Sequence, residues 1–427
     1  MRRLYRGIVQ MYNMVVVMSL CIAATCSFSA CFNDSDGPEP SKEDPAYAQS
    51  RTVLVYMAAE NSLDNKVTGD VAEMLAGMRD ETLYAGDRLV LYVDDVTLPR
   101  LYLIDKNTQA RSLSEMTPVV KYEEDVNSAS ANELEKVLKQ VKTLWPAESY
   151  GLVMWSHSTG WIPSTNAEDM VSVQAKQRRS FGVDNCMNVS YEPSNGGRQM
   201  DIRYMARALE KAGGVDFILF DACVMQSMEV VYELRHATKY VLGSPAEIPG
   251  PGAFYTTMVK AMFKQDNYDK EMLQAYYDYY TKVNNSYGLV ISSVKTSALS
   301  DFAAYMKTVI AAHRDDFLTA NYNKALNYLR FAWTNYLYPD MYDAQGIMKV
   351  VLSADEFTRW KQEVAKVVTC KHATGWYSGY NKKLNSIDDE QCCGVSMYVP
   401  CSVYEQSRLN LNEYYFTLDW GQNVWGE

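Results

Sequence analysis

Two reactive side chains follow buried strands in the sequence, and their types fit covalent catalysis. Residues 217–220 form a continuous apolar run, typical of a central parallel strand covered on both faces. Cys223 comes just after this run and before a helix-like segment, at the sheet edge where open α/β folds place their chemistry. The positive end of a following helix would favour the thiolate. His157 ends a second apolar strand, residues 150–157, so the pair predicts a cysteine nucleophile with a histidine base.

The arrangement of these two strands decides whether the pair can meet. Neighbouring parallel strands would bring their ends to about 5 Å, or about 10 Å with one strand between them. A lone cysteine after an apolar strand is more often a small core residue, so neither Cys223 nor His157 is specific by itself. Their equivalent positions favour the catalytic reading. Asp221 precedes Cys223 by two residues, and strand alternation predicts that both point to the same side, where the acid would attract a cationic substrate group.

The surrounding elements predict a doubly wound α/β fold. Strands and helices alternate from Arg51 onward, as expected of an open, mostly parallel sheet flanked by helices. Residues 51–319 should form this domain, and residues 320–427 a mainly helical extension packed on it. Between the two reactive residues, residues 158–199 lack regular patterning, and a stretch of that length is usually functional or flexible.

The amino terminus predicts export. Residues 1–30 combine a basic head with an apolar core at residues 14–24, followed by small residues before Cys31. This arrangement resembles a bacterial lipoprotein signal, with Cys31 as the lipidated first residue of the mature chain. An uncleaved membrane anchor is the alternative, but the apolar run is short of the ~20 residues of a spanning helix. Residues 31–50 are rich in Asn, Asp, Ser, Gly and Pro and should be a flexible tether.

Charge and composition restrict the partners. The formal net charge of −11 leaves no basic stripe for phosphates, which argues against nucleic acid. Only the lipid anchor should contact a membrane, in the cell envelope, and the outer membrane and the cell surface are both open as the site of display. No Cys-x-x-Cys pair supports a zinc site, and no Asp-x-Asp-x-Asp-Gly loop indicates calcium.

Four stretches carry a resemblance to a known family. They are Trp-Ser-His-Ser-Thr-Gly-Trp at residues 155–161, Phe-Asp-Ala-Cys-Val-Met at 220–225, the opening at 53–63, and Gly-Ser-Pro-Ala-Glu-Ile-Pro-Gly at 243–250. Together they resemble the clostripain-type cysteine peptidases, family C11 of the caspase-like group. The resemblance implies the caspase-like (caspase-hemoglobinase) fold and a cysteine endopeptidase that cleaves proteins or peptides after Arg or Lys.

The resemblance also implies a role for each matching residue. His157 becomes the general base and Cys223 the nucleophile, with the backbone N–H groups of Ser158 and Cys223 holding the oxyanion. Asp221 becomes the acid of the S1 pocket. The family usually has Gly where this chain has Ser158, and Ser tolerates unusual backbone angles less well.

Such peptidases are commonly matured by a cut after the catalytic histidine that leaves a light and a heavy chain associated. The corresponding stretch here offers a basic cluster, and the preferred bond is Arg179–Ser180. The alternative is a solvated charged loop without a processing role. The residues of this predicted processing segment are Lys176, Arg178, Arg179 and Ser180.

Two other functions remain open from the sequence. Ser158 leaves room for a catalytically impaired peptidase-fold lipoprotein that acts as a surface binding protein. A transpeptidase with the same dyad would give ligation products in place of hydrolysis. The chemistry of the dyad requires no cofactor or metal. Some relatives use calcium, so a calcium ion stays an open expectation.

Overall fold

A computed structural model describes most of the chain after the predicted tether, and all of the described residues fall within one unit, residues 42–427. Cys31 and the predicted processing segment lie outside the described residues. Within the described residues, no helix combines the length and the apolar character of a membrane span. The described ranges are 50–162, 181–185, 198–328, 341–378, 382–402 and 411–426.

A mixed sheet forms the centre of this unit, with the strand order β12-β10-β9-β8-β5-β1-β2-β3-β4. The five inner strands from β9 to β2 are parallel, and the strands at both edges are antiparallel. The open, mostly parallel sheet predicted from the sequence is therefore confirmed. The strands are β1 (Arg51–Ala58), β2 (Arg88–Asp94), β3 (Arg100–Ile104), β4 (Val120–Lys121), β5 (Ser149–Trp155), β8 (Val215–Asp221), β9 (Thr238–Gly243), β10 (Val290–Lys295) and β12 (Val368–Ala373).

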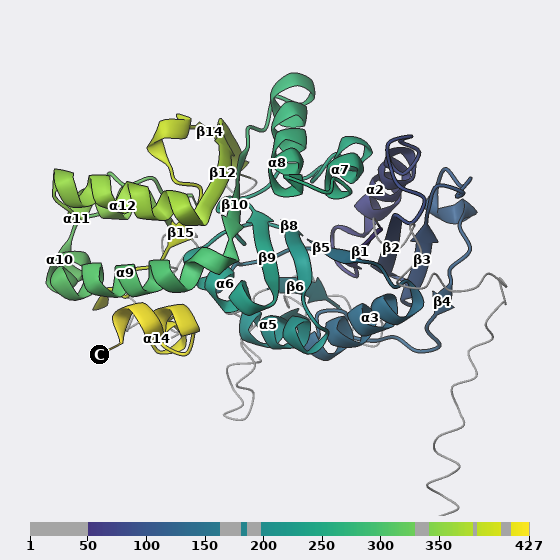
Figure 1. Cartoon of the computed structure of the whole chain (residues 1–427), viewed down its shortest axis with the longest axis horizontal. Coiled ribbons are helices and arrows are strands. Elements are labelled where there is room, and N and C mark those ends of the chain that lie inside the picture. Colours follow the sequence, from purple (N-terminus) through teal and green to yellow (C-terminus); the bar gives the residue numbers. More distant parts are fainter. Residues whose placement is uncertain are drawn as a thin grey trace, which may run out of the picture. The chain divides into compact units, whose positions relative to one another are not determined.

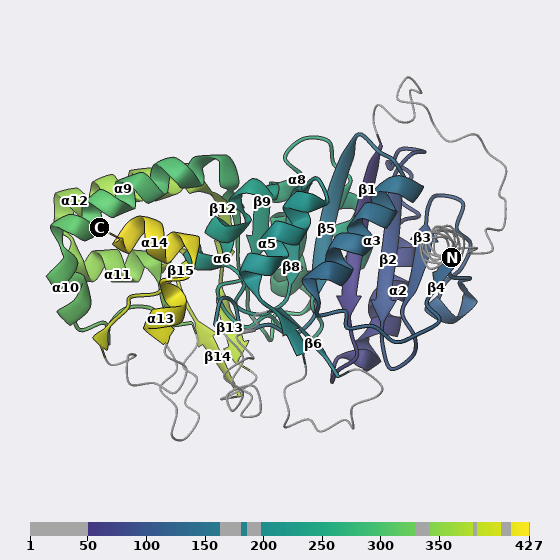
Figure 2. The same cartoon turned by 90° about the horizontal axis from the view of Figure 1, so that it is seen from below.

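Helices cover both faces of the sheet (Figures 1 and 2). Three of them, α2, α7 and α8, pack on one face, and α3, α5 and α6 pack on the other. In α2 the buried side chains Val67, Val71 and Met74 recur at helical spacing, which gives the helix one apolar side for the sheet. The helices are α2 (Asp64–Gly77), α3 (Ala131–Leu144), α5 (Ile202–Lys211), α6 (Met228–Glu233), α7 (Tyr255–Met262) and α8 (Tyr268–Asp278).

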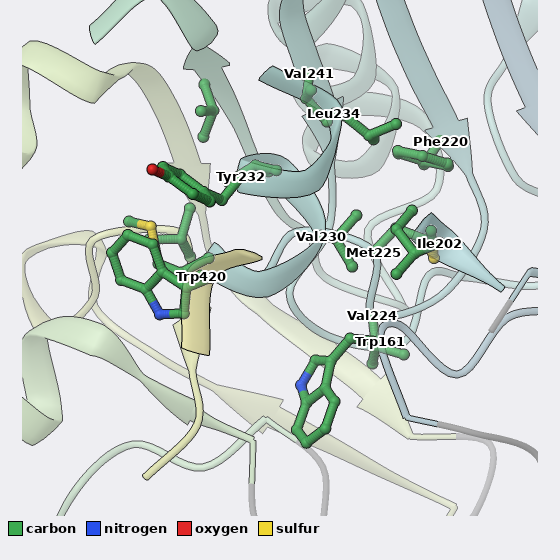
Figure 3. Close-up of a cluster of buried hydrophobic side chains, with 14 of the residues drawn as sticks. Trp161, Ile202, Phe220, Val224, Met225, Val230, Tyr232, Leu234, Val241 and Trp420 are labelled. Carbon is green, nitrogen blue, oxygen red and sulfur yellow. The ribbon is translucent and has the colours of Figure 1, made fainter. Parts of the chain in front are cut away.

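Strand β8 contributes to the hydrophobic cores on both faces. Phe217 and Leu219 point into the core beneath α7 and α8, whereas Ile218 and Phe220 point into the opposite core. This alternation explains why the sequence of β8 is apolar throughout, since both of its faces are buried. Figure 3 shows part of the second core, where Phe220 lies near Met225.

The C-terminal segment is continuous with the sheet and its core. Beyond residue 320 the chain supplies the edge strand β12, which pairs with β10. The fully buried Trp420 belongs to the same core as Phe220. Short strand pairs accompany the expected helices, and the predicted strand at residues 394–399 is reduced to β15. The remaining elements are α9 (Leu299–Ala312), α10 (Arg314–Thr319), β11 (Tyr342–Asp343), α11 (Ala344–Val351), α12 (Ala354–Val367), β13 (Gly375–Ser378), β14 (Lys383–Ser386), β15 (Ser396–Met397), α13 (Leu411–Tyr415) and α14 (Asp419–Trp425).

Candidate active site

The strands that carry the two reactive residues are direct neighbours. β5 and β8 pair in parallel, and their last paired residues are Trp155 and Asp221. His157 and Cys223 each follow two residues later, so both leave the sheet at the same level of its carboxyl edge. The sequence left open whether the two strands are direct neighbours or have one strand between them, and the structure shows that they are direct neighbours.

The histidine contacts a serine from the loop after β1. The Nε2 atom of His157 lies 2.8 Å from Ser62 Oγ, and the tautomer decides which of the two donates. The carbonyl oxygen of His157 accepts a hydrogen bond from the N–H of Gly182 at 3.0 Å. Burial lowers the pKa of His157, so the ring is neutral near pH 7, as a general base must be.

The cysteine is held as a thiol in this form of the chain. Cys223 is partly exposed and packs against the core around Phe220. Burial raises the pKa of Cys223 to about 11, and the negative charges of Glu247 and Asp221 add to this, while a hydrogen bond from the backbone of Ile248 opposes it. The expectation of a helix-stabilised thiolate is therefore wrong for this form.

The position of the following helix explains why the thiolate is not stabilised. α6 begins only at Met228, and one of its first-turn donors, the N–H of Val230, is bound by the Ser227 side chain at 3.3 Å. The positive end of a helix acts within its first turn, and Cys223 lies outside that range in the sequence.

A strained turn sets the direction of the cysteine. Val224 has φ of 52°, a left-handed conformation that is unusual for a β-branched residue. Its N–H donates to the carbonyl of Ala246 at 2.9 Å, and Gly160 approaches so closely that a Cβ there would lie 2.7 Å from the carbonyl oxygen of Val224. The two motifs of the sequence thus pack directly against each other at this turn.

Ser158 joins the same contact. Its hydroxyl donates to the carbonyl oxygen of Cys223, so the side chain that replaces the usual Gly binds the backbone of the proposed nucleophile. Among the described non-glycine residues, positive φ occurs at Val224, Asn267 and Lys382, but not at Ser158. The backbone at position 158 therefore does not require glycine.

Asp221 is buried beneath the other face of the sheet. Its carboxylate accepts hydrogen bonds from Tyr276 Oη at 2.6 Å, Tyr255 Oη at 2.8 Å and the N–H of Ala253 at 3.2 Å. Burial raises the pKa of Asp221, and these hydrogen bonds oppose the rise. Asp221 faces α7 and α8, whereas Cys223 packs on the opposite core. The expected shared side is wrong because β8 ends at Asp221 and the chain turns at Val224.

Two further carboxyl groups lie near Asp221 and were missed from the sequence. Asp70 Oδ2 accepts from Trp155 Nε1 at 2.8 Å, and Glu73 accepts from the N–H of Tyr255 at 2.9 Å. Burial raises the pKa of Asp70 to about 8, and the charge of Asp221 contributes. Both residues lie on α2. No motif connects that helix to β8, so only the fold could reveal this acidic group.

A second acidic group lies near the histidine loop. One carboxylate oxygen of each of Glu60, Asp94 and Asp184 lies within 4.8 Å of the others. These residues are far apart in the sequence, so no local motif marks the group. Asp184 belongs to β6 (Phe181–Asp184), and Phe181 forms a bridge with Ser158. The segment that follows the predicted processing bond is therefore anchored beside the histidine.

Comparison with known proteins is consistent across sequence and fold. The Clostripain family model matches residues 55–425. Clostripain of Hathewaya histolytica is 28% identical over 241 residues, which cover 50% of this chain and 42% of clostripain. The aligned stretch thus spans less than half of the length of that relative.

Two solved structures cover most of the chain. An inactive zymogen C11 protease from Parabacteroides distasonis is 28% identical with a TM-score of 0.70, covering 88% of this chain and 97% of its own. A secreted C11 cysteine protease from Bacteroides thetaiotaomicron, solved with an irreversible peptide inhibitor, is 29% identical with a TM-score of 0.70, covering 88% and 98%. On the family match and the caspase-like fold shared with these proteases, the chain belongs to the clostripain family.

Proposed function

We propose that this chain is an exported cysteine endopeptidase that cleaves after Arg or Lys with Cys223 and His157. The observation that carries the proposal is the register of β5 with β8. It places His157 and Cys223 just after the ends of neighbouring strands, at the same level of the sheet edge. Clostripain and the C11 proteases of similar fold support the same reaction class.

The reaction follows from the roles of these groups. The sulfur of Cys223 bonds to the substrate carbonyl carbon while its proton passes to His157. Backbone N–H groups of Ser158 and Cys223 are placed to hold the oxyanion. His157 then protonates the leaving amine, and it later takes a proton from the water that releases the acyl group and restores the thiol.

The uncut chain has the features of a resting form. The imidazole of His157 contacts Ser62, and the thiol of Cys223 is protonated near pH 7. Maturation by self-cleavage at Arg179–Ser180 would act near these groups, because Phe181, the second residue after this bond, bridges Ser158. Replacing Lys176, Arg178 and Arg179 together by Ala should leave a single chain on a denaturing gel. Normal processing of that variant would overturn this part of the proposal.

A preference for basic P1 side chains is supported by the charge around Asp221. Asp70 and Glu73 lie near it, and the charge of Asp221 adds to burial in raising the pKa of both carboxyl groups. Tyr255 and Tyr276 hold the carboxylate of Asp221 in place. A guanidinium or ammonium group would be attracted to this region, with Asp221 as the acid of the S1 pocket.

A substitution with a matched control tests the activity. The Cys223→Ala variant should lose hydrolysis of reporter peptides that end in Arg or Lys. Cys401→Ala removes another partly exposed cysteine outside the site and should keep it. Equal activity of Cys223→Ala and the parent would refute the nucleophile. Amine-dependent ligation in place of hydrolysis would identify a transpeptidase.

The alternative of an impaired binding lipoprotein rested on Ser158. Because Ser158 adopts negative φ and its hydroxyl binds the carbonyl of Cys223, this residue gives no structural reason for lost activity. Export is supported by the predicted signal and by the secreted relative. The lipid anchor rests on Cys31, and the intact mass of the mature protein tests it together with the processing cut.

A further inference from the structure

The hydroxyl of Ser62 is the polar group that meets the imidazole of His157. Its Oγ lies 2.8 Å from Nε2, whereas Nδ1 has no hydrogen-bond partner among the described residues. Burial is what lowers the pKa of His157, and no charged side chain of the described residues adds to this effect. The orientation of the ring and the position of its proton therefore depend on this one contact.

The order of the strands places the histidine between Ser62 and Cys223. β1, β5 and β8 are consecutive neighbours in the sheet, with β5 in the middle. Ser62 lies in the loop after β1, His157 follows β5, and Cys223 follows β8. Because the residue on the β1 side occupies Nε2, Nδ1 is the ring nitrogen that remains to serve the cysteine on the β8 side.

The loop that carries Ser62 is fixed by the residue before it. Asn61 Nδ2 donates to the carbonyl oxygens of Ala58 at 2.9 Å and Val183 at 2.7 Å, and Asn61 Oδ1 accepts from the N–H of Leu63 at 2.9 Å. These three hydrogen bonds close a turn around Ser62 and tie it to both β1 and β6. A hydroxyl held in this way is preorganised to orient the ring.

We infer that Ser62 is a positioning residue of the proposed dyad. Its Oγ accepts a hydrogen bond from the Nε2–H of His157 and so keeps Nδ1 unprotonated for the thiol of Cys223. Ser62 is exposed, so its own hydroxyl hydrogen can bind solvent while the oxygen accepts. In the opposite tautomer Nδ1 carries the hydrogen and cannot take a proton. The catalytic role rests on the proposed function, whereas the tautomer does not.

The same hydrogen bond becomes stronger when the ring takes the proton of Cys223. The donor is then an imidazolium, and hydrogen bonds from charged donors are roughly twice as strong as neutral ones. Ser62 therefore stabilises the protonated ring more than the neutral ring, which favours the proton transfer. The contact leaves Nδ1 without a partner, so it can persist from the uncut chain into the processed enzyme.

Ser62→Ala tests the role in the processed enzyme. On a reporter peptide that ends in Arg, kcat should fall about 10-fold and KM should change less than about twofold, because the loss falls on proton transfer. A 10-fold loss equals about 1.4 kcal/mol, so the pKa of the ring should fall to match and the acidic limb of the kcat/KM profile should move about one pH unit lower. Ser62→Thr keeps the hydroxyl and should restore about a third or more of the parent kcat.

Ser114→Ala is the matched control for the loss of a hydroxyl. Ser114 is another exposed serine, and its Oγ lies 3.0 Å from Ser112 Oγ, outside the site. This variant should match the parent in rate and in pH profile. If Ser62 were only structural, Ser62→Ala would lower the rate and leave the acidic limb where it is in the parent.

A second measurement reads the tautomer directly and does not depend on catalysis. The chain has four histidines, so labelling histidine with the NMR-active nitrogen isotope gives few signals in the full-length protein, and a His157→Gln variant identifies those of His157. Near pH 7 we expect the Nε2–H tautomer in the parent and in Ser62→Thr. Ser62→Ala should show a mixture of both tautomers, because water can then bind either nitrogen.

Three results would overturn the inference. The first is an Nδ1–H tautomer in the parent, which would make Ser62 the donor. The second is an unchanged tautomer together with an unchanged acidic limb in Ser62→Ala. The third is a changed tautomer with an unchanged kcat, which would mean that the contact has no role in proton transfer. If the parent shows no hydrolysis that depends on Cys223 while its tautomer still depends on Ser62, the proposed function fails and the orientation of the ring stands.

Discussion

The reactivity of Cys223 in the uncut chain follows from its pKa. The perturbation is the replacement of Lys176, Arg178 and Arg179 by Ala, which should keep the chain in the resting form. With a pKa of about 11, against an ordinary value of 9.0, the thiolate fraction near pH 7.5 falls about 100-fold. The higher nucleophilicity of a more basic thiolate returns roughly 8-fold of this, since the Brønsted slope is about 0.4–0.5. Alkylation should therefore be about 10-fold slower than for an ordinary cysteine.

The assay is the rate of iodoacetamide labelling at the peptide that contains Cys223, followed by mass spectrometry. In the resting form the rate should rise close to tenfold for each pH unit from about 7 to 10, because the thiol titrates only near pH 11. After processing, the same peptide should react at least 10-fold faster near pH 7.5, as expected if His157 then pairs with the thiol. A resting-form rate that levels off below about pH 8.5 would refute the reasoning.

Three further substitutions test the surroundings of the site. Asp221→Asn should lower kcat/KM at least ~100-fold for peptides with Arg at P1 and leave those with a neutral P1 little changed; equal losses on both would make Asp221 a structural residue. Asp70 has its pKa raised from 3.8 to about 8, so the folded state binds more protons and stability falls as pH rises through that window. Asp70→Asn should therefore resist urea better than the parent near pH 8, with the advantage vanishing toward pH 4; identical pH slopes would contradict this. Arg51→Lys should lower the free energy of unfolding by about 2–3 kcal/mol. The buried guanidinium of Arg51 donates to Met262 O and Lys264 O at 2.6 and 2.7 Å and lies 4.4 Å from the Tyr268 ring, and lysine cannot make all of these contacts. A loss below about 0.5 kcal/mol in urea unfolding would contradict this.

The sheet and the neighbouring strand ends could be predicted because they depend on local patterns. The apolar runs before His157 and Cys223 mark strands buried on both faces, and the order of strands and helices restricts the topology. The thiolate expectation failed for a local reason, since the start of α6 at Met228 depends on the turn at Val224. The residue types do not predict that turn, because valine rarely adopts positive φ.

The carboxylate groups could not be predicted for a different reason. Asp94 and Asp184 meet only because β6 returns beside the ends of β1 and β2. Likewise, the tyrosines that bind Asp221 come from α7 and α8, well beyond the motif. Such contacts depend on tertiary packing, and no spacing of residues in a single sequence indicates them.

The central claim is that Cys223 is the nucleophile of an enzyme that selects basic side chains. Its most direct test is to incubate the processed protein with a thiol-reactive probe that carries arginine and to measure the intact mass and the labelled peptide. We predict one adduct on Cys223, and a large loss of labelling in the His157→Ala variant. Labelling at another cysteine, or none on a processed and folded protein, would contradict the account.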